Sequence, residues 1–202
     1  MGKYELLDLI EPPGEGAALY KAVQVGLERA VALKVLFPEE AEEEAKLARF
    51  QREQQATAQL NHGSIITVYD SGVHNGFHYY VTEFLQRKTL SDRIQESGPL
   101  SQADILKFGH NILSAFAYTH EKRILHRNLS AKSIGFDLRG RAIVKDFAAV
   151  KVLDDTKLTH SGELVGNRLY MAPEQLPDQA ADERSDLYLI SAVLYEMATG
   201  QR

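Results

Sequence analysis

Short runs of alternating apolar residues follow one another through the first part of the chain, and they constrain its fold more than any other feature. A period of two is typical of a strand that buries one face. Gly26 turns the second run into the third, and the Asn75-Gly76 step favours a tight hairpin between the last two. The runs predict a small antiparallel sheet with strands at residues 4–10, 18–25, 30–36, 65–69 and 77–83.

Two longer segments have the periodicity or composition of helices. One helix is predicted over residues 39–60, where an acidic run directly after Pro38 is most simply a solvated helix start. A second begins with Ser101 and Asp104, a pair that resembles a capping box. Its predicted core-facing stripe consists of Ile105, Phe108, Ile112, Ala115 and Thr119.

The rest of the chain adds a short hairpin and a last helix. Residues 134–136 and 142–144 flank the turn-forming segment 137–140 and predict two short strands. An apolar helix is predicted over residues 187–197. The expected fold class is therefore α+β, with a strand-rich first part and a helical second part.

Composition excludes several classes of function. The chain has 202 residues, is 44% hydrophobic and carries a net charge of −5, without a basic stripe, so nucleic acid is not expected as a partner. The absence of cysteine excludes disulfides and thiolate metal sites. No signal peptide and no apolar run of membrane-spanning length is present, which predicts a cytoplasmic protein or the cytoplasmic part of a longer one.

Five short motifs occur in a fixed order along the chain. V-A-L-K ends at Lys34, H-R-N-L begins at His126, D-F-A begins at Asp146, A-P-E ends at Glu174, and R-S-D-L-Y begins at Arg184. Each alone has an ordinary explanation; a lone strand lysine, for example, is usually a solvated side chain. Together they resemble the protein kinase family, most closely bacterial-type Ser/Thr kinases. Aminoglycoside phosphotransferases share that fold but lack A-P-E, so they match less well.

The resemblance implies a bilobal fold. Residues 1–85 would form an antiparallel-sheet N-lobe with one helix and the hinge, and residues 86–202 would form a helical C-lobe. In kinases, later helices bury the helix that corresponds to residues 187–197. The resemblance therefore also implies either a sequence trimmed after this helix, and hence an incomplete C-lobe, or a partner that covers the helix.

The resemblance implies binding of ATP and Mg²⁺. Lys34 would hold the phosphates and would be fixed by Glu53, with Glu43 and Glu44 as alternatives nearer the helix start. Asp146 would bind the metal ion. The remaining positions implied for the nucleotide are Gly14, Gly16, Leu19, Ala32, the gatekeeper Thr82, and the hinge residues Glu83 and Leu85.

The residues that carry the chemistry depart from the family pattern. Asn128 stands at the position of the catalytic Asp, Ser130 at that of a Lys, and Ser133 at that of a metal-binding Asn. An amide has no basic site near neutral pH, so Asn128 can orient a substrate hydroxyl but cannot take its proton. Ala148 also replaces the glycine of D-F-G.

The phosphate-binding loop departs as well. Pro12, Gly14 and Ala17 occupy the three glycine positions, so only Gly14 remains, although Gly16 restores some freedom. Proline offers no N–H to a phosphate, and Ala17 adds a methyl group. An ordinary hairpin turn and a working phosphate clamp both remain open as interpretations.

These departures favour a pseudokinase with weak ATP binding and a scaffolding or regulatory role toward a protein partner. The first alternative is a weakly active Ser/Thr kinase that transfers the γ-phosphate of ATP to protein, and the second is another nucleotide-dependent transfer. Thr156, Thr159 and Ser161 are candidate acceptors for an upstream kinase. Arg127 would pair with such a phosphate, or would only brace the loop.

Overall fold

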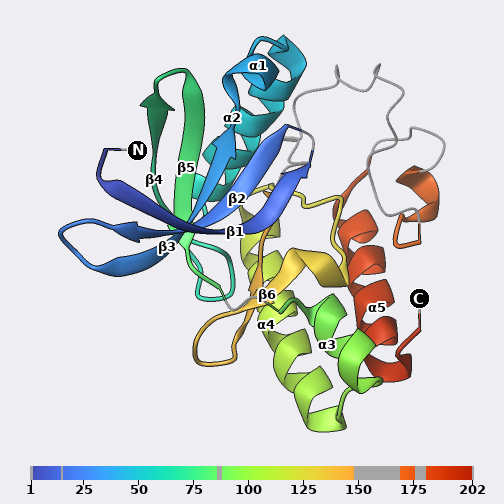
Figure 1. Ribbon diagram of the computed structural model, residues 1–202. Coiled ribbons are helices and arrows are strands. Elements are labelled where there is room, and N and C mark those ends of the chain that lie inside the picture. Colours follow the sequence, from blue (N-terminus) through green and yellow to red (C-terminus); the bar gives the residue numbers. More distant parts are fainter. Residues whose placement is uncertain (1, 15, 86–87, 148–168, 176–180, 202) are drawn as a thin grey trace. The chain divides into compact units, whose positions relative to one another are not determined.

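The computed structural model describes residues 2–14, 16–85, 88–147, 169–175 and 181–201 (Figure 1). The chain divides into two compact units, one of residues 1–61 and 66–87 and the other of residues 62–65 and 88–202. The strands are β1 (Tyr4–Gly14), β2 (Ala17–Gln24), β3 (Arg29–Leu36), β4 (Val68–His74), β5 (Phe77–Glu83), β6 (Ile134–Phe136) and β7 (Ala142–Val144). The helices are α1 (Pro38–Ala41), α2 (Glu44–Ala58), α3 (Leu90–Ser97), α4 (Gln102–Glu121) and α5 (Glu183–Thr199), with 3₁₀ turns η1 (Ala131–Ser133) and η3 (Pro173–Gln175).

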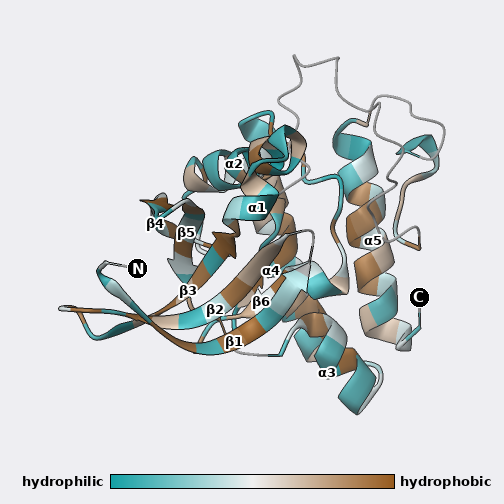
Figure 2. Cartoon of the chain, turned by 45° about the horizontal axis from the view of Figure 1, so that its top comes forward, coloured by the Kyte–Doolittle hydropathy of each residue, from teal (hydrophilic) through white to brown (hydrophobic). Residues whose placement is uncertain are grey.

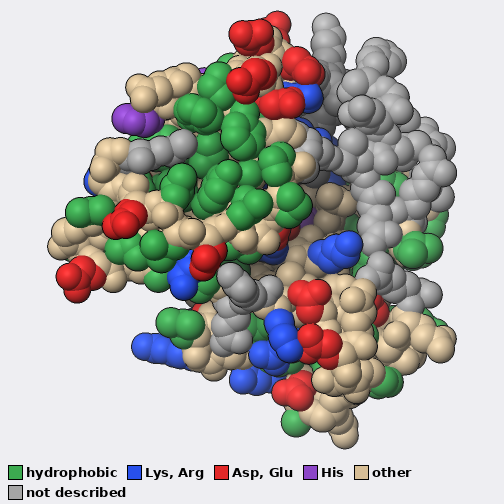
Figure 3. Space-filling model, viewed as in Figure 1, with side chains coloured by type: hydrophobic (Ala, Val, Ile, Leu, Met, Phe, Trp, Pro, Cys, Tyr) green, Lys and Arg blue, Asp and Glu red, His purple; other side chains and the backbone are tan. Residues whose placement is uncertain are grey.

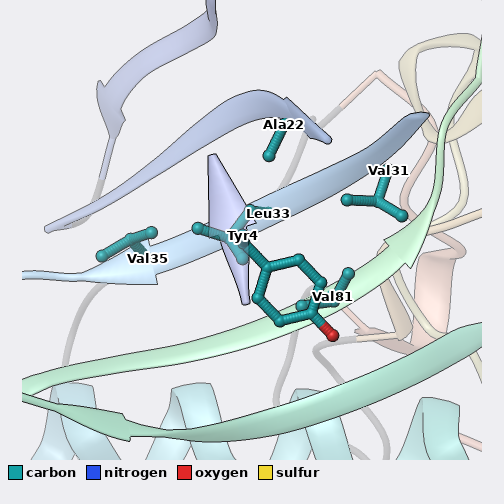
Figure 4. Close-up of a cluster of buried hydrophobic side chains, with 6 residues drawn as sticks. All are labelled: Tyr4, Ala22, Val31, Leu33, Val35 and Val81. Carbon is teal, nitrogen blue, oxygen red and sulfur yellow. The ribbon is translucent and has the colours of Figure 1, made fainter. Parts of the chain in front are cut away.

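The first unit is built on one antiparallel sheet in the order β1-β2-β3-β5-β4. Val31, Leu33 and Val35 share one buried face of β3, as a period of two predicts, but Ala32 and Leu36 on the other face are buried as well. The resulting core consists of Tyr4, Ala22, Val31, Leu33, Val35 and Val81 (Figure 4). The predicted antiparallel sheet is therefore confirmed.

The hairpin between β4 and β5 corrects one predicted strand. Asn75 and Gly76 have φ of 50° and 82°, the left-handed values that a tight Asn-Gly turn requires. Pairing extends from His74 opposite Phe77 back to Val68, so the strand predicted at residues 65–69 is wrong in its bounds. The apolar residues 65–69 misled the prediction because most of β4 is polar or exposed. The bounds of β4 follow instead from the register that the Asn75-Gly76 turn sets with β5.

The single helix predicted over residues 39–60 is also wrong. The helix is interrupted after α1, and Glu43 has the extended backbone of an N-cap before α2 begins. Like charges three and four positions apart destabilise a helix, which accounts for a break within the run of glutamates. Figure 3 shows these acidic side chains gathered over α1, where Lys46 pairs with Glu40 and Glu43.

The second unit contains the helices α3, α4 and α5. Thr89 and Asp92 form a capping box at the start of α3, and Ser101 caps α4 by accepting a hydrogen bond from the Asp104 N–H, as predicted. Of the predicted stripe on α4, Ile105 is half-buried and the other members are buried. The predicted hairpin of residues 134–144 is confirmed as β6 and β7.

Helix α5 lies beside α4 and begins four residues earlier than predicted, because Asp182 supplies its N-cap. Hydrophobic residues run along its middle (Figure 2). One face is buried, whereas Leu187, Tyr188 and Tyr195 remain about half exposed. In the described part of the chain, no helix combines the length and the apolar character that crossing a membrane would need.

Candidate functional site

The first unit brings Lys34 and Glu53 together. Lys34 lies on β3, and its Nζ is 2.5 Å from Oε1 of Glu53 on α2. The hydroxyl of Tyr80, opposite Lys34 on β5, donates a hydrogen bond of 2.5 Å to the same oxygen. The alternatives do not take this place, because Glu43 caps α2 and pairs with Lys46, and Glu44 lies in the first turn.

Local packing fixes this group. Phe50, Glu53 and Thr57 are the buried residues of α2, and their spacing of three and four positions places them on one face. The Phe50 ring contacts the Tyr80 ring at a centroid distance of 5.2 Å. Glu53 is 6% exposed, so its carboxylate depends on the Lys34 ammonium and the Tyr80 hydroxyl rather than on water.

The residues expected at the adenine site lie on paired strands of the same unit. Ala32 is opposite Thr82 across β3 and β5, and both are buried. Leu19 is opposite Lys34 across β2 and β3. Glu83 ends β5, where its N–H donates to the Thr67 carbonyl at 3.0 Å and its carboxylate accepts from the Thr67 N–H. Leu85 follows two residues later.

The turn between β1 and β2 is tight. Gly14 pairs with Ala17, and Gly16 has a φ of 83°, which favours glycine. A Cβ atom on Gly16 would lie 2.7 Å from Oε2 of Glu40, so the carboxylate of Glu40 is in contact with this turn. The carboxylate of Glu40, which also pairs with Lys46, therefore lies beside the backbone amides that would have to approach a phosphate.

In the second unit, one buried carboxylate holds the loop of residues 126–133. Asp186 on α5 accepts hydrogen bonds from the N–H of His126 at 2.9 Å and the N–H of Arg127 at 2.8 Å. A third comes from Nε2 of His120 at 2.9 Å. Burial acts to raise the pKa of Asp186, but the hydrogen bond from His120, nearby His126 and the two backbone amides outweigh it and hold the pKa below its usual range.

The His126 side chain connects this loop to the segment around Asp146. Its Nε2 donates to the Lys145 carbonyl at 3.0 Å, and its ring lies 4.7 Å from that of Phe147 and 5.7 Å from that of Phe116. Arg127 and Asp146 have φ of 62° and 64°, uncommon values for residues other than glycine. The loop thus keeps a specific backbone shape through hydrogen bonds and ring packing.

The exchanged residues share this loop. The Asn128 N–H points to Nδ1 of His126 at 3.4 Å, and the Ser133 hydroxyl lies 3.5 Å from the Asn128 carbonyl oxygen. Ser130 and Ser133 are buried, with their hydroxyl oxygens 3.2 Å apart. The loop therefore presents an amide and two hydroxyls, none of which is a base near neutral pH.

The donors present do not match the expected Mg²⁺ sites. Mg²⁺ demands octahedral oxygen ligands, usually with a carboxylate among them. Asp146 offers one carboxylate, but Nζ of Lys145 lies 3.8 Å from its Oδ2, and the Ser133 hydroxyl is directed at other groups of the loop. No group of three metal-binding side chains occurs among the described residues. A kinase-like pair of metal ions does not fit this arrangement.

Arg127 is held through both its backbone and its side chain. Its carbonyl accepts from Nε2 of Gln175 at 2.9 Å, and its Nη2 lies 3.4 Å from the Ala181 carbonyl. Burial lowers the pKa of Arg127, against the opposing charge of Asp186. Its Nε is buried without a hydrogen-bond partner among the described residues. The positions expected to be phosphorylated, Thr156, Thr159 and Ser161, lie outside those residues, as does Ala148.

Sequence reasoning did not identify three residues of these sites. Tyr80 was missed because the pairing of β3 with β5 cannot be derived from either strand alone. Asp186 lies within the R-S-D-L-Y motif, which predicted only the start of an apolar helix and not a buried carboxylate that binds a distant loop. Lys145 directly precedes Asp146, so the sequence shows that two opposite charges are adjacent along the chain. It does not show how close their ammonium and carboxylate groups lie.

The chain is similar to several curated bacterial kinases. It is 34% identical over 200 residues to the serine/threonine-protein kinase PrkC of Bacillus subtilis, covering 99% of the chain and 31% of the relative. It is 36% identical over 211 positions to the probable serine/threonine-protein kinase PknB of Bifidobacterium longum, covering 99% and 30%. It is 32% identical over 187 residues to PknL of Mycobacterium tuberculosis, covering 93% and 47%.

The chain thus spans from about a third to just under half of the length of these relatives. The family model described as the protein kinase domain matches residues 13–202. The antiparallel-sheet unit and the helical unit of the chain agree with the fold that this family implies. The chain therefore belongs to the protein kinase family, as a domain of the bacterial Ser/Thr type.

Proposed function

We propose that this domain is a pseudokinase, which binds ATP weakly and acts on a protein partner through its surface. The proposal rests on one contrast: the paired Lys34, Glu53 and Tyr80 in the first unit, and Asn128 in place of an acid in the second. In this proposal, residues 1–85 form the N-lobe with the hinge and residues 86–202 belong to the C-lobe. A cytoplasmic location follows because ATP is the ligand.

The nucleotide roles belong to the same proposal. The Lys34 ammonium would bind phosphate oxygens as a point charge, held in place by Glu53. The backbone groups at Glu83 and Leu85 would bind adenine next to Thr82. Leu19, Ala32 and the backbone at Gly14 and Gly16 would complete the nucleotide site. Binding is expected to be weak for two reasons. Of the three glycine positions of the kinase phosphate-binding loop, only Gly14 is a glycine, and the β1–β2 turn is in contact with Glu40.

The chemical deficit can be estimated. A general base contributes about 10²- to 10⁴-fold to a rate, which at about 1.36 kcal/mol per decade corresponds to about 3–5 kcal/mol of transition-state stabilisation. Asn128 cannot supply this contribution. Ser130 and Ser133 remove a positive charge and a metal ligand in addition. The proposal therefore predicts phosphotransfer well below that of an ordinary kinase.

A weakly active kinase is the second candidate, and a specific observation favours it. Asp186 and His126 still hold the loop backbone, so a substrate hydroxyl could be oriented beside Asn128 even without a base. Phosphoryl transfer depends mainly on positioning and charge neutralisation. The two candidates therefore differ in rate, not in fold.

Ligand binding and phosphotransfer, measured on the same preparation, test the proposal. ATP at about 100 times its dissociation constant should stabilise the folded chain by about 2.7 kcal/mol in a thermal-shift series, with or without Mg²⁺. Lys34→Met should abolish most of that shift. Because the change leaves buried Glu53 with only the Tyr80 hydroxyl as partner, the ligand-free midpoint should also fall, so the shift of each variant is measured from its own ligand-free midpoint. Radiolabelled phosphotransfer should stay near background. A folded chain with no shift at millimolar ATP, or with ordinary kinase turnover, would contradict the proposal.

A further inference from the structure

Lys145 contacts residues at both positions at which kinases place their metal ligands. Its Nζ is 3.8 Å from Oδ2 of Asp146, the expected metal ligand. Its N–H donates to the carbonyl of Ser133, at the other metal position, at 2.9 Å. One lysine is thus linked to both halves of the expected metal site, through its side chain to one and through its backbone to the other.

The backbone of Lys145 is fixed on both sides. It directly follows β7, where Val144 pairs with Ile134 of β6, and its carbonyl accepts a hydrogen bond from the His126 ring at 3.0 Å. His126 is itself held through its N–H by buried Asp186. The point from which the Lys145 side chain leaves the backbone is therefore set by the same network that shapes the loop of residues 126–133.

The charges at this site differ from those of a metal centre. A divalent ion needs a carboxylate free of competing cations and a second oxygen ligand. Here the ammonium of Lys145 already opposes the carboxylate of Asp146, and an ion bound there would be repelled by it. Ser133 is neutral, and its hydroxyl lies within reach of Ser130 Oγ and the Asn128 carbonyl. Asp92, in turn, feels the charges of both Lys132 and Lys145.

We infer that the ammonium of Lys145 takes the place of a divalent cation in this domain, so that nucleotide triphosphate is bound without Mg²⁺. The ammonium neutralises Asp146 and offers a fixed positive charge to phosphate oxygens. Lysine binds phosphate as a compact point charge and needs no ordered set of oxygen ligands. This inference rests on the proposed ATP binding and specifies which cation accompanies the nucleotide.

Calorimetric titration with ATP, in excess EDTA and in excess Mg²⁺, tests the inference on the nucleotide side. The parent chain should bind with dissociation constants that agree within about twofold between the two conditions. Lys145→Met should weaken binding in EDTA by at least about tenfold, and Mg²⁺ should restore part of it. Lys145→Arg should stay close to the parent. Lys132→Met removes an exposed lysine of the same loop and should change nothing.

A second measurement needs no nucleotide. Mn²⁺ titrated into the ligand-free chain and followed by electron paramagnetic resonance should show no binding to the parent. Lys145→Met should allow weak Mn²⁺ binding through Asp146, adding Ser133→Asn should strengthen that binding, and adding Asp146→Asn should remove it. Unfolding curves of each variant establish that all are folded.

The outcomes separate the two proposals. If the parent loses ATP affinity in EDTA as strongly as Lys145→Met does, the inference is overturned while ATP binding stands. If no ATP is bound in any condition, the proposed nucleotide function fails, and the Mn²⁺ measurement still decides the role of Lys145. Mn²⁺ binding to the parent as tight as to Lys145→Met would overturn the inference on its own.

Discussion

Each unit contains a buried carboxylate, but the two hold different kinds of group. Glu53 binds side chains, the Lys34 ammonium and the Tyr80 hydroxyl. Asp186 binds mainly the backbone, through the N–H groups of His126 and Arg127. In the first unit the arrangement therefore depends on which side chains are present. In the second unit the hydrogen bonds from the loop to Asp186 do not involve the side chain at position 128.

This difference explains how a kinase loop can lose its acid without losing its fold. A backbone N–H is available at every residue except proline, so Asp186 makes the same hydrogen bonds beside Asn128 as it would beside an aspartate. Replacement of Lys34, by contrast, would leave Glu53 buried with only a hydroxyl as partner. The variants of Asp186, Asn128 and Tyr80 below test whether the two carboxylates differ in this way, and a variant of Glu40 tests the phosphate-binding turn of the first unit.

The largest effect is expected for Asp186→Ala. Breaking a buried ionic and hydrogen-bonded group by removing one partner typically costs about 3–5 kcal/mol. The free energy of unfolding, measured with urea, should fall by that amount. Asp182→Ala on the same helix is the matched control, because losing an N-cap costs only about 1 kcal/mol. Equal losses in the two variants would show that Asp186 is not a special anchor.

The same residue predicts a pH dependence. The pKa of Asp186 is lower in the folded chain than in the unfolded chain, so its contribution to stability is complete above the unfolded pKa of about 3.9. That contribution is lost as the pH falls through the folded pKa. The difference in unfolding free energy between the parent and Asp186→Ala should therefore shrink with acidification below about pH 4. A constant difference would contradict the assignment.

The second-largest effect should follow from restoring the loop chemistry. Asn128→Asp with Ser133→Asn returns a base and a metal-ligating amide to a backbone that is already held in shape. Phosphotransfer should rise by about 10²-fold, at the low end of the range for a general base, because Ser130 and Lys145 remain. Either change alone should give less. An unchanged rate in a folded double variant would indicate that backbone shape is also lost.

A smaller effect is expected for Tyr80→Phe in the first unit. The change removes one hydrogen bond to Glu53 and keeps the ring against Phe50. The unfolding free energy should fall by about 1–2 kcal/mol, as expected for a hydrogen bond to a charged group. ATP affinity should weaken with it, because Glu53 is then held by Lys34 alone. Tyr79→Phe, on the same strand, is the control and should leave ATP affinity unchanged.

The smallest effect is expected for Glu40→Gln. Removing the negative charge beside the Gly16 turn should strengthen binding of ATP by about two- to threefold, within the range of an exposed charge interaction. Adenosine, which has no phosphate, should bind as before. Glu39→Gln, in the same acidic run, is the control. A gain for adenosine equal to that for ATP would exclude a phosphate-specific effect.

Much of this arrangement could be predicted from the sequence, and the failures have physical causes. The pairing of Lys34 with Glu53 was predictable because motif order fixed one residue and helix-forming residues the other. The break between α1 and α2 was not, because a propensity pattern does not include repulsion between glutamates three and four positions apart. The bounds of β4 depend on register with β5, which is a property of two strands.

The roles assigned to the site residues remain predictions. Nucleotide contacts at Gly14, Thr82 or Leu85 depend on a ligand, and the sequence gives only their positions in a family pattern. The role inferred for Lys145 could not be predicted from its position next to Asp146 in the sequence. It depends on the separation of 3.8 Å between Lys145 Nζ and Asp146 Oδ2, which only the structure gives. Side-chain separations are set by packing across the unit and cannot be derived from neighbouring letters.

The hydrogen bonds from the loop backbone to Asp186 also have a consequence for protein engineering. Because Asp186 binds the N–H groups of His126 and Arg127 and not the side chain at position 128, that position can be varied as a library while these hydrogen bonds are kept. Ser130 and Ser133 are buried, so replacements there must also fit the packing of the loop. Selections for altered phosphate chemistry, or for a trapped substrate complex, can therefore begin from this domain rather than from an active enzyme. The low phosphotransfer expected of the parent domain is an advantage in such selections, because any gain in activity is measured against a low background rate.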